Sequence, residues 1–547
     1  RRDELPIDIW GLDMDWRVIA NGMEGKEYKV NTEDFPDMRS FYSYAHEHGL
    51  SVYMNDHPMS HVNRSDVSEL DPSEAKFRYD GLTSLFDLGL DFWWYDENWG
   101  GIIPGLTFGS GEVDHLVWGQ EIFRSVLAHY TAVNGPRNAT KPFETVSLSM
   151  FSSQHPAEHR FPVWWTGDVV YTMLLDNVHK MVNGGLDLQP YVHPDCGAHY
   201  GVPFVEETPE MFVRWAQFCA MGTIVRFHTN DCCDHRPWTW GEEAEAAIKK
   251  ILDLRYTLMP TLIAAGRRAT EDGTPVVQRL DLTWPDLAEA GAAAPDQYLF
   301  ADGTILVAPI IPFNGSDPVA KNASNGPGNA SRTVWVPPGQ WQDAWSSAVV
   351  AGPKTIQVTD CPLDQIPMWH KKGSLLLTAK PMGSTKEQSW SELSVEVFPF
   401  PLLTERNNDS DHEPMRTYEG AFYDTKANWE APPKQALHLS QHASGGAASV
   451  RIMGGGAARS WRIRVHLPPG QRIARGGLLD GEVVNFTAVD YAPSAERSRG
   501  ALIVPLTDRP SAGGGPAVVD PVAGHVFEAL VIADAAQERM LSFNITD

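Results

Sequence analysis

Short apolar runs alternate with amphipathic stretches through the first 230 residues, and this alternation limits the possible folds more than any other feature. Such a rhythm is typical of βα units, in which helices join parallel strands. Helical patterns lie at Met38–His48, Asp114–Ala132 and Pro209–Met221. The pattern predicts strands at Ile7–Met14, Leu50–Asn55, Leu90–Tyr95, Glu144–Met150, Val163–Thr166, Leu186–Val192 and Gly222–Phe227. Together these elements predict a (β/α)8 barrel of the TIM type whose first strand is missing from this chain.

Polar side chains recur where the predicted strands end. The carboxyl ends of the strands form the active face of such barrels, so these residues are the first candidates for a site. They are Asp13, Asp15, Asp56, Asp96, Asp168, Asp195 and His228.

Two of the strands are rich in tryptophan and run directly into a carboxylate. The segment Leu90–Trp99 passes through Trp94 to Asp96, and Arg160–Asp168 passes through Trp165 to Asp168. With one strand missing at the start, these aspartates close the fourth and sixth strands and can face each other across a pocket. Retaining glycosidases need two carboxylates about 5–5.5 Å apart. On the pattern alone, ordinary strand-end or helix-capping aspartates are an equally good interpretation.

Composition excludes several classes of partner. The 547 residues are too many for one core, so we expect two to four domains. The formal charge of -26 argues against binding to nucleic acid or to an anionic membrane surface. No apolar run approaches the roughly 18 residues of a membrane-spanning helix.

The residue pattern of the sequence changes near residue 275. Strand-like runs separated by Gly/Pro turns follow, at Tyr298–Ile311, Thr333–Val336, Ser374–Leu377 and Leu393–Phe398. The predicted fold class is therefore α/β plus all-β, with the barrel followed by two β-sandwich domains. We expect strands 2 to 8 of the barrel in 1–274, a proximal C-terminal β domain in 275–378 and a distal β-sandwich in 379–547.

The N-glycosylation sequons and the cysteines indicate the cellular compartment in which the protein resides. The sequence holds five cysteines, an odd number, so at least one thiol is free or is paired with another chain. Eight sequons predict a glycosylated chain in the secretory pathway or outside the cell. They lie at Asn63, Asn138, Asn314, Asn322, Asn329, Asn408, Asn485 and Asn544. No signal peptide is visible, and the abrupt first strand leads us to expect residues upstream.

An ordered set of segments resembles glycoside hydrolase family 31. The two signature segments are Trp94–Asp96 and Trp165–Asp168, and further matches follow in the order of the family. These are Ile9–Trp16 (IWGLDMDW), Phe35–Pro58, Asp195–Gly197, Arg214–Gln217, Arg226–His228, Arg236–Trp238, Tyr298–Phe300, Ile305–Pro309, Val334–Trp345 and Cys361–Ser374 (CPLDQIPMWHKKGS). The family contains α-glucosidases, α-xylosidases and related transglycosylases.

The resemblance implies a role for each matching residue. Asp96 would be the nucleophile and Asp168 the acid/base, and the strand count points to the same two residues. The side chains that hold sugar hydroxyls would be Asp13, Arg160, Asp195 and His228, and the walls of the site would be Trp16, Trp94 and Trp165.

Several of these residues, and some of their neighbours, have a second interpretation. Asp15 could replace Asp13, and His228 could be a packed core histidine. Glu97 follows the nucleophile on the strand, so it points to the opposite face and is better read as structural. Asp91 would cap or pair within the barrel. The run Asp231–His235 invites a metal interpretation, but adjacent cysteines rarely reach one ion, and a disulfide from Cys232 or Cys233, for example to Cys196, fits better.

The resemblance also shows where this chain departs from the family. Glu97–Trp99 and Cys196–Ala198 replace common family segments that line the pocket, which leaves the substrate open. The N-terminal β-sandwich and first barrel strand of the family are absent, so we expect an upstream segment or a separate chain to complete the barrel.

We therefore expect a secreted or lumenal retaining α-glycosidase, most similar to α-glucosidases, that uses a carbohydrate substrate and needs neither metal nor cofactor. A transglycosylase, α-xylosidase or α-galactosidase on the same site is the nearest alternative. A non-catalytic carbohydrate-binding or structural glycoprotein is the alternative of another class.

Overall fold

The computed structural model describes two compact units, and each is considered by itself. The first comprises Arg1–Val169, Tyr191–Asp195 and Gly383–Gln388, and the second comprises Val170–Pro190, Cys196–Met382 and Ser389–Asp547. The residues described are 5–18, 28–56, 72–96, 106–108, 111–113, 125–126, 128–130, 132–134, 163–201, 207–230, 234–293, 296–311, 330–400, 415–425, 431–442, 446–453, 457, 459–468, 471–480, 482–484, 487–489, 526–533 and 538–546.

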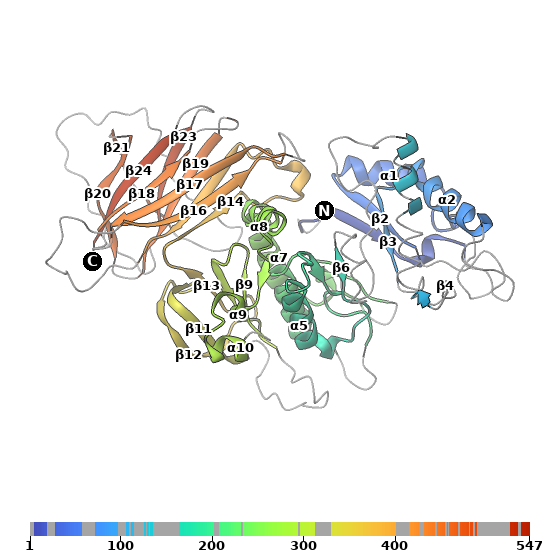
Figure 1. Cartoon of the computed structure of the whole chain (residues 1–547), viewed down its shortest axis with the longest axis horizontal. Helices are drawn as coiled ribbons and strands as arrows, with labels where there is room; N and C mark the ends of the chain where they lie inside the picture. Colours follow the sequence, from blue (N-terminus) through green and yellow to red (C-terminus); the bar gives the residue numbers. More distant parts are fainter. Residues whose placement is uncertain are drawn as a thin grey trace. The chain divides into compact units, whose positions relative to one another are not determined.

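The first unit begins with three parallel strands in the order β1-β2-β3 (Figure 1). They are β1 (Ile9–Leu12), β2 (Ser51–Asp56) and β3 (Phe92–Tyr95), joined through α1 (Met38–Glu47) and α2 (Pro72–Phe86). Four of these five elements, β1, β2, β3 and α1, were predicted from the sequence and match closely, because the strands are apolar and α1 begins after a capping residue, Asp37. The helix α2 was not predicted. A short hairpin of β4 (Leu106–Phe108) and β5 (Gly111–Val113) follows.

A second parallel pair joins β6 (Trp164–Trp165) to β7 (Val192–His193). The strand predicted at Leu186–Val192 is wrong over most of its length, since 185–188 form turns after α5 (Leu174–Gly184). Leu186 and Leu188 are exposed, so their apolar character was a misleading signal. The strand predicted at Gly222–Phe227 is reduced to one bridge between Phe227 and Cys196. The prediction at Glu144–Met150 lies outside the described residues, as does most of Asp114–Ala132.

Three long helices follow in the second unit. These are α6 (Pro209–Ala220), α7 (Glu242–Thr257) and α8 (Met259–Glu271). Thr208 caps α6 by accepting a hydrogen bond from the backbone N–H of Met211, and every residue from Met211 to Ala220 is buried. A helix that is buried on all sides is mostly apolar in sequence, and the two buried polar side chains of α6, Arg214 and Gln217, hydrogen-bond to each other.

The cysteine pairing corrects a sequence expectation. Cys196 forms a disulfide with Cys219 of α6, not with Cys232 or Cys233, which lie outside the described residues. The Cys361 thiol is free and buried. Among the described residues, no helix is both long enough and apolar enough to cross a membrane.

A six-stranded antiparallel sheet comes next, in the order β12-β11-β13-β10-β9-β8. The two short helices α9 (Leu280–Thr283) and α10 (Ala288–Ala293) share its core through Leu280 and Ala290. The strands are β8 (Val277–Gln278), β9 (Tyr298–Phe300), β10 (Ile305–Val307), β11 (Ala330–Asp343), β12 (Val349–Cys361) and β13 (Met368–Lys371).

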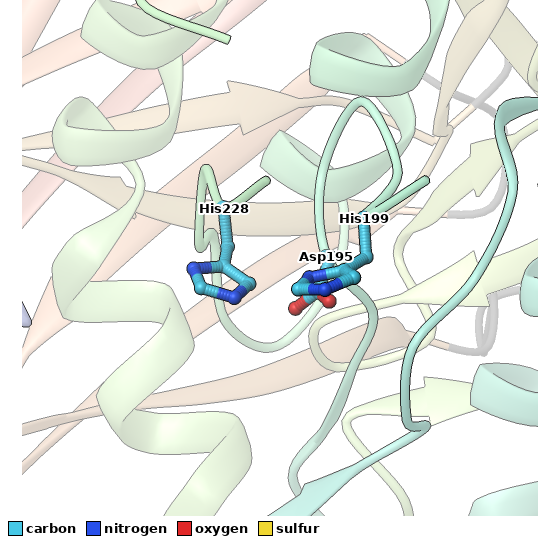
Figure 2. A group of neighbouring side chains, drawn as sticks. All are labelled: Asp195, His199 and His228. Atoms are coloured by element: carbon cyan, nitrogen blue, oxygen red, sulfur yellow. The ribbon is translucent and has the colours of Figure 1, made fainter. Parts of the chain in front are cut away.

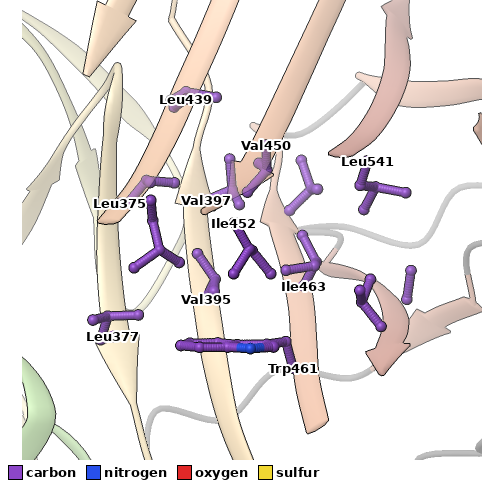
Figure 3. Packing of buried hydrophobic residues seen from close by; sticks show 14 of the residues in the cluster. Leu375, Leu377, Val395, Val397, Leu439, Val450, Ile452, Trp461, Ile463 and Leu541 are labelled. Atoms are coloured by element: carbon purple, nitrogen blue, oxygen red, sulfur yellow. The ribbon is translucent and has the colours of Figure 1, made fainter. Parts of the chain in front are cut away.

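The last part of the chain is a sandwich of two sheets, and its shared core is drawn in Figure 3. One sheet has the order β14-β15-β19-β23-β22 and the other β16-β17-β18-β24-β20-β21. β14 pairs with β15, so this sheet begins at Ser374, before the boundary predicted at residue 378. The strands are β14 (Ser374–Thr378), β15 (Glu392–Phe398), β16 (Met415–Tyr423), β17 (Lys434–His442), β18 (Ala447–Ile452), β19 (Arg459–His466), β20 (Arg472–Leu479), β21 (Glu482–Val484), β22 (Thr487–Val489), β23 (Val526–Ala533) and β24 (Arg539–Thr546).

Candidate active site

Two of the predicted carboxylates meet at a single asparagine in the first unit. Asn55, near the carboxyl end of β2, donates from Nδ2 to Asp13 Oδ1 at 2.7 Å and to Asp96 Oδ2 at 2.6 Å. Asp96 directly follows β3 and is buried, with 6% of its surface exposed. The backbone N–H of Met14 also donates to Asp13 Oδ1, at 2.6 Å. The ends of β1, β2 and β3 therefore bring together residues that are 42 and 41 positions apart in the sequence.

The aspartate that ends β2 has a different environment. Asp56 accepts from Arg17 Nη2 at 2.8 Å and from the Tyr28 hydroxyl at 3.1 Å, and it is fully buried. Burial, together with the Asp56 carboxylate, raises the pKa of Tyr28, so the phenol stays protonated and can donate. Asp56, a strand-end candidate in the sequence, thus lies in a buried ion pair beside the site.

Aromatic side chains connect the strand of Asp96 with the strand of Asp168. Trp94 of β3 and Trp165 of β6 form an edge-to-face pair with ring centroids 5.1 Å apart. Trp165 Nε1 also donates to Asp195 Oδ1 at 2.8 Å. Asp168 is half-buried and follows Gly167, whose φ of 86° is a left-handed conformation that favours glycine. This turn lets the backbone change direction directly after the aromatic strand.

A second polar group lies around Asp195 (Figure 2). One ligand-type atom from each of Asp195, His199 and His228 lies within 4.8 Å of the others. The rings of His199 and His228 are tilted toward each other, with centroids 5.0 Å apart. A carboxylate and two imidazoles can hold sugar hydroxyls or could supply three ligands to a metal ion. The sequence reading missed His199, which lies four residues after Asp195 and had no distinguishing signal.

The remaining predicted residues have different environments. Trp16 is almost completely buried in the core cluster of Trp93, and its Nε1 donates to the Asn55 carbonyl at 2.8 Å. Asp15 is exposed, unlike Asp13. Asp91 accepts from His46 and from the N–H of Val52, which confirms that it pairs within the barrel. Arg160, Glu97 and the sequons other than Asn544 lie outside the described residues.

The structure describes only Asp234 and His235 of the run Asp231–His235, which suggested a metal site in the sequence. The side chain of Arg236 donates to Asp234 and lowers the pKa of that carboxyl to about 2. His235 Nε2 lies 3.0 Å from Glu207 Oε1. Asp234 and His235 thus each have another partner within the described residues.

Asn55 is the functional candidate that sequence reasoning passed over. It is the last residue of the strand predicted at Leu50–Asn55, and the charged residue beside it, Asp56, is the stronger sequence signal. Its side chain became informative only when β1, β2 and β3 were placed side by side.

Comparisons with known proteins agree with this arrangement. Residues 1–265 match the sequence model described as "Glycosyl hydrolases family 31 TIM-barrel domain", and residues 273–376 match "Glycosyl hydrolase family 31 C-terminal domain". The barrel and the C-terminal β domains predicted from sequence are thereby confirmed. The described strands β1, β2, β3, β6 and β7 belong to that barrel.

Individual relatives are distant. A 1,6-alpha-glucosyltransferase from Sporosarcina globispora is 23% identical over 77% of this chain and 35% of its own length. An alpha-xylosidase from Saccharolobus solfataricus is 22% identical over 81% of this chain and 60% of its own length. A dextranase structure from Flavobacterium johnsoniae, complexed with glucose, superposes over 100% of this chain and 67% of its own, with a TM-score of 0.74 and 15% identity. The chain spans between about one third and two thirds of the lengths of these proteins.

Proposed function

Because the chain belongs to glycoside hydrolase family 31, we propose that the protein hydrolyses α-glycosides with retention of anomeric configuration, through a covalent glycosyl-enzyme. The observation that carries this proposal is the buried carboxylate of Asp96. It follows a tryptophan-rich strand, accepts a hydrogen bond from an amide, and is linked through Trp94 and Trp165 to the strand that ends at Asp168.

The mechanism assigns one step to each carboxylate. Asp96 attacks the anomeric carbon as the glycosidic C–O bond breaks, and the Asp168 carboxyl gives its proton to the leaving oxygen. Asp168, now ionised, then takes a proton from a water molecule whose oxygen attacks the same carbon and releases Asp96. Each attack inverts the configuration, so the product retains that of the substrate.

The surrounding residues would bind and orient the sugar. Asp13, Arg160, Asp195 and His228 would hold sugar hydroxyls, and Trp94 and Trp165 would form the walls. Trp16, expected as a third wall, packs with Trp93 in another cluster and supports the site through its hydrogen bond to the Asn55 carbonyl. The hydrogen bond from Trp165 to Asp195 supports a fixed direction for that carboxylate. Bonds to hydroxyls that strengthen in the oxocarbenium-like transition state would contribute most to the rate.

One experiment tests the proposal directly. Aryl α-glucosides, α-xylosides and α-galactosides are incubated with the protein between mildly acidic and neutral pH, and the first-formed anomer is followed by NMR. We expect an α-glucoside to be cleaved fastest and the α-anomer to appear first. Absence of cleavage across the panel would favour a non-catalytic carbohydrate-binding protein, and a β-anomer would contradict double displacement.

A transglycosylase is the second candidate, because the 23% identical relative is named as a glucosyltransferase. The two activities differ in whether water or a sugar hydroxyl attacks the glycosyl-enzyme. Product analysis with a rising concentration of acceptor sugar separates them, since only transfer yields longer oligosaccharides at the expense of free monosaccharide.

We also propose that an upstream segment or a separate chain completes the barrel beside β1. Within the described part of the chain this strand lies at the edge of its three-stranded sheet, and Ile9 and Trp10 are 42% and 47% exposed. An open edge with exposed apolar side chains is a surface that another strand can cover. Hydrogen exchange at the β1 amides should slow when the segment is supplied and stay unchanged if it docks elsewhere.

Glycosylation and passage through the secretory pathway complete the proposal. The exposed position of Asn544 on β24 and the disulfide of Cys196 with Cys219 support an oxidising, glycosylating compartment. Enzymatic removal of N-glycans from the protein expressed in a eukaryotic secretory host should lower its mass at occupied sequons. An unchanged mass would reject glycosylation.

A further inference from the structure

We propose that Asn55 is a positioning residue that holds Asp13 and Asp96 side by side as carboxylates through the two hydrogens of one amide group. This inference deepens the proposed function and rests on it, because it gives the nucleophile a fixed partner that is not itself in the reaction.

The geometry defines which way the amide faces. Nδ2 lies 2.7 Å from Asp13 Oδ1 and 2.6 Å from Asp96 Oδ2. The nitrogen carries two donors, one for each carboxylate, whereas the amide oxygen in its place would repel both. Both hydrogen bonds go to a group that can be charged, and such bonds are roughly twice as strong as neutral ones.

The amide replaces a repulsion by two attractions. Two carboxylates that share one site disfavour each other's ionisation, and one of them then takes up a proton. Donors that hydrogen-bond to the charged form have the opposite effect. A nucleophilic carboxylate must be ionised to attack, so Asn55 keeps Asp96 active although a second carboxylate is bound to the same amide.

The backbone around Asn55 is held on several sides. β2 is the central strand of its sheet, where Asn55 is paired with Trp94 of β3, and only 1% of Asn55 is exposed. Its carbonyl accepts from Trp16 Nε1 at 2.8 Å. Buried tryptophan therefore fixes the position of the amide, and the amide fixes the orientation of the two carboxylates. Trp16 contributes to the site through this contact whatever its role toward sugar.

The kinetic test compares the pH profile of kcat/KM in the wild type, Asn55→Ala and a matched control. The control is Asn177→Ala. Asn177 lies on α5, is also a buried asparagine, and donates from its side chain to the Met173 carbonyl. We expect the acidic limb to move upward by about one pH unit in Asn55→Ala, a tenfold loss of kcat/KM at acid pH. The limb should keep its position in Asn177→Ala. An unmoved limb in an active Asn55→Ala would overturn the inference and leave the proposed function standing.

A second measurement does not depend on activity. Asn55→Asp places three carboxylates together, so its melting temperature should fall below that of the wild type near pH 8 and approach it near pH 4, where closely spaced carboxyls take up protons. The double variant Asn55→Asp/Asp13→Asn places the carboxylate of residue 55 between an amide and Asp96, which removes one of the added repulsions, and should recover part of the loss at pH 8. A deficit of equal size at both pH values, or no recovery in the double variant, would show that Asn55 only fills space. The melting temperatures can be compared even if the wild type cleaves no glycoside. In that case the proposed function fails, and the melting temperatures alone test whether Asn55 holds the two carboxylates.

Discussion

Trp94 and Trp165 meet edge to face, with ring centroids 5.1 Å apart, although 71 positions separate them in the sequence. Each lies a few residues before a candidate catalytic aspartate, Asp96 or Asp168. They share a small buried cluster with Tyr53 and Phe92, and such aromatic pairs contribute about 0.5–1.5 kcal/mol beyond the area they bury. The contact thus connects the two strands whose ends carry the proposed chemistry.

Asp96→Asn should lower kcat/KM on any cleaved α-glycoside by at least about a thousandfold, because the neutral amide cannot attack the anomeric carbon. Initial rates on an aryl α-glycoside measure the effect. Asp91→Asn is the matched control at the start of the same strand, where the carboxylate accepts from His46 and from Val52. An active Asp96→Asn protein would remove the assignment of Asp96 as nucleophile.

Asp168→Ala should separate substrates by leaving group. Aryl glycosides with good leaving groups need little protonation and should still form the glycosyl-enzyme, whereas alkyl glycosides and oligosaccharides should not react. The measurement is the ratio of kcat/KM for the two substrate types. Asp176→Ala, which removes an exposed carboxylate early in α5, should leave this ratio unchanged. Equal losses on both substrate types would contradict an acid/base role.

Trp165→Phe should weaken sugar binding without unfolding the protein. The phenyl ring keeps much of the contact with Trp94, but the Nε1 donor to Asp195 is lost, so we expect kcat/KM to fall about tenfold. Trp93→Phe is the control, because Trp93 faces the other side of β3 and donates to the Leu82 carbonyl. It should cost about 1 kcal/mol of stability and leave kcat/KM unchanged. If Trp165→Phe and Trp93→Phe have the same kcat/KM, the hydrogen bond from Trp165 to Asp195 does not contribute to activity.

Lys372→Met should stabilise the protein near pH 7. Burial lowers the pKa of Lys372 to about 7, while the unfolded chain keeps the ordinary value near 10.4. The unfolded state therefore binds more protons between these values, and wild-type stability rises with pH from about 7 to about 10. Methionine removes this dependence and should gain about 1–3 kcal/mol at pH 7, even though Gln342 and the His466 carbonyl lose a donor.

Denaturant unfolding at pH 7 and pH 10 measures the difference between Lys372→Met and the wild type. The gain should be largest at pH 7 and disappear by pH 10, where the wild-type lysine is neutral when folded. His466, whose carbonyl accepts from Lys372, pairs with Glu396, and both groups are the same in the two proteins that are compared. Lys380→Met, at an exposed lysine that pairs with Glu392, should show no such trend. A pH-independent difference for Lys372→Met would mean that its ammonium is solvated.

Reduction should lower the melting temperature of the wild type but not that of the double variant Cys196→Ala/Cys219→Ala. The disulfide joins residues 23 positions apart, and closing a loop of this length contributes about 2–4 kcal/mol. Thermal unfolding with and without dithiothreitol gives the result. An equal response of both proteins to the reductant would show that this bond carries no stability.

The sequence by itself determined the elements with strong local signals. The apolar strands near Asp13, Asn55 and Asp96 were visible from periodicity, and α6 from its mostly apolar pattern after Thr208. The alternation of strands and helices was enough to predict the barrel, because helices can return a parallel chain only in a few ways. The same reasoning failed at Leu186–Val192, where exposed leucines in turns imitate a strand.

Tertiary structure decided which of these residues meet. Pairing of β2 between β1 and β3 placed one amide between Asp13 and Asp96, and no local pattern marks Asn55 for that role. The partner of Cys196, the approach of His199 to His228 and the burial of Lys372 were likewise undetermined, since each depends on elements distant in sequence. Local propensity fixes where strands begin and end, but the contacts of a side chain follow from register and packing, which only the folded chain defines.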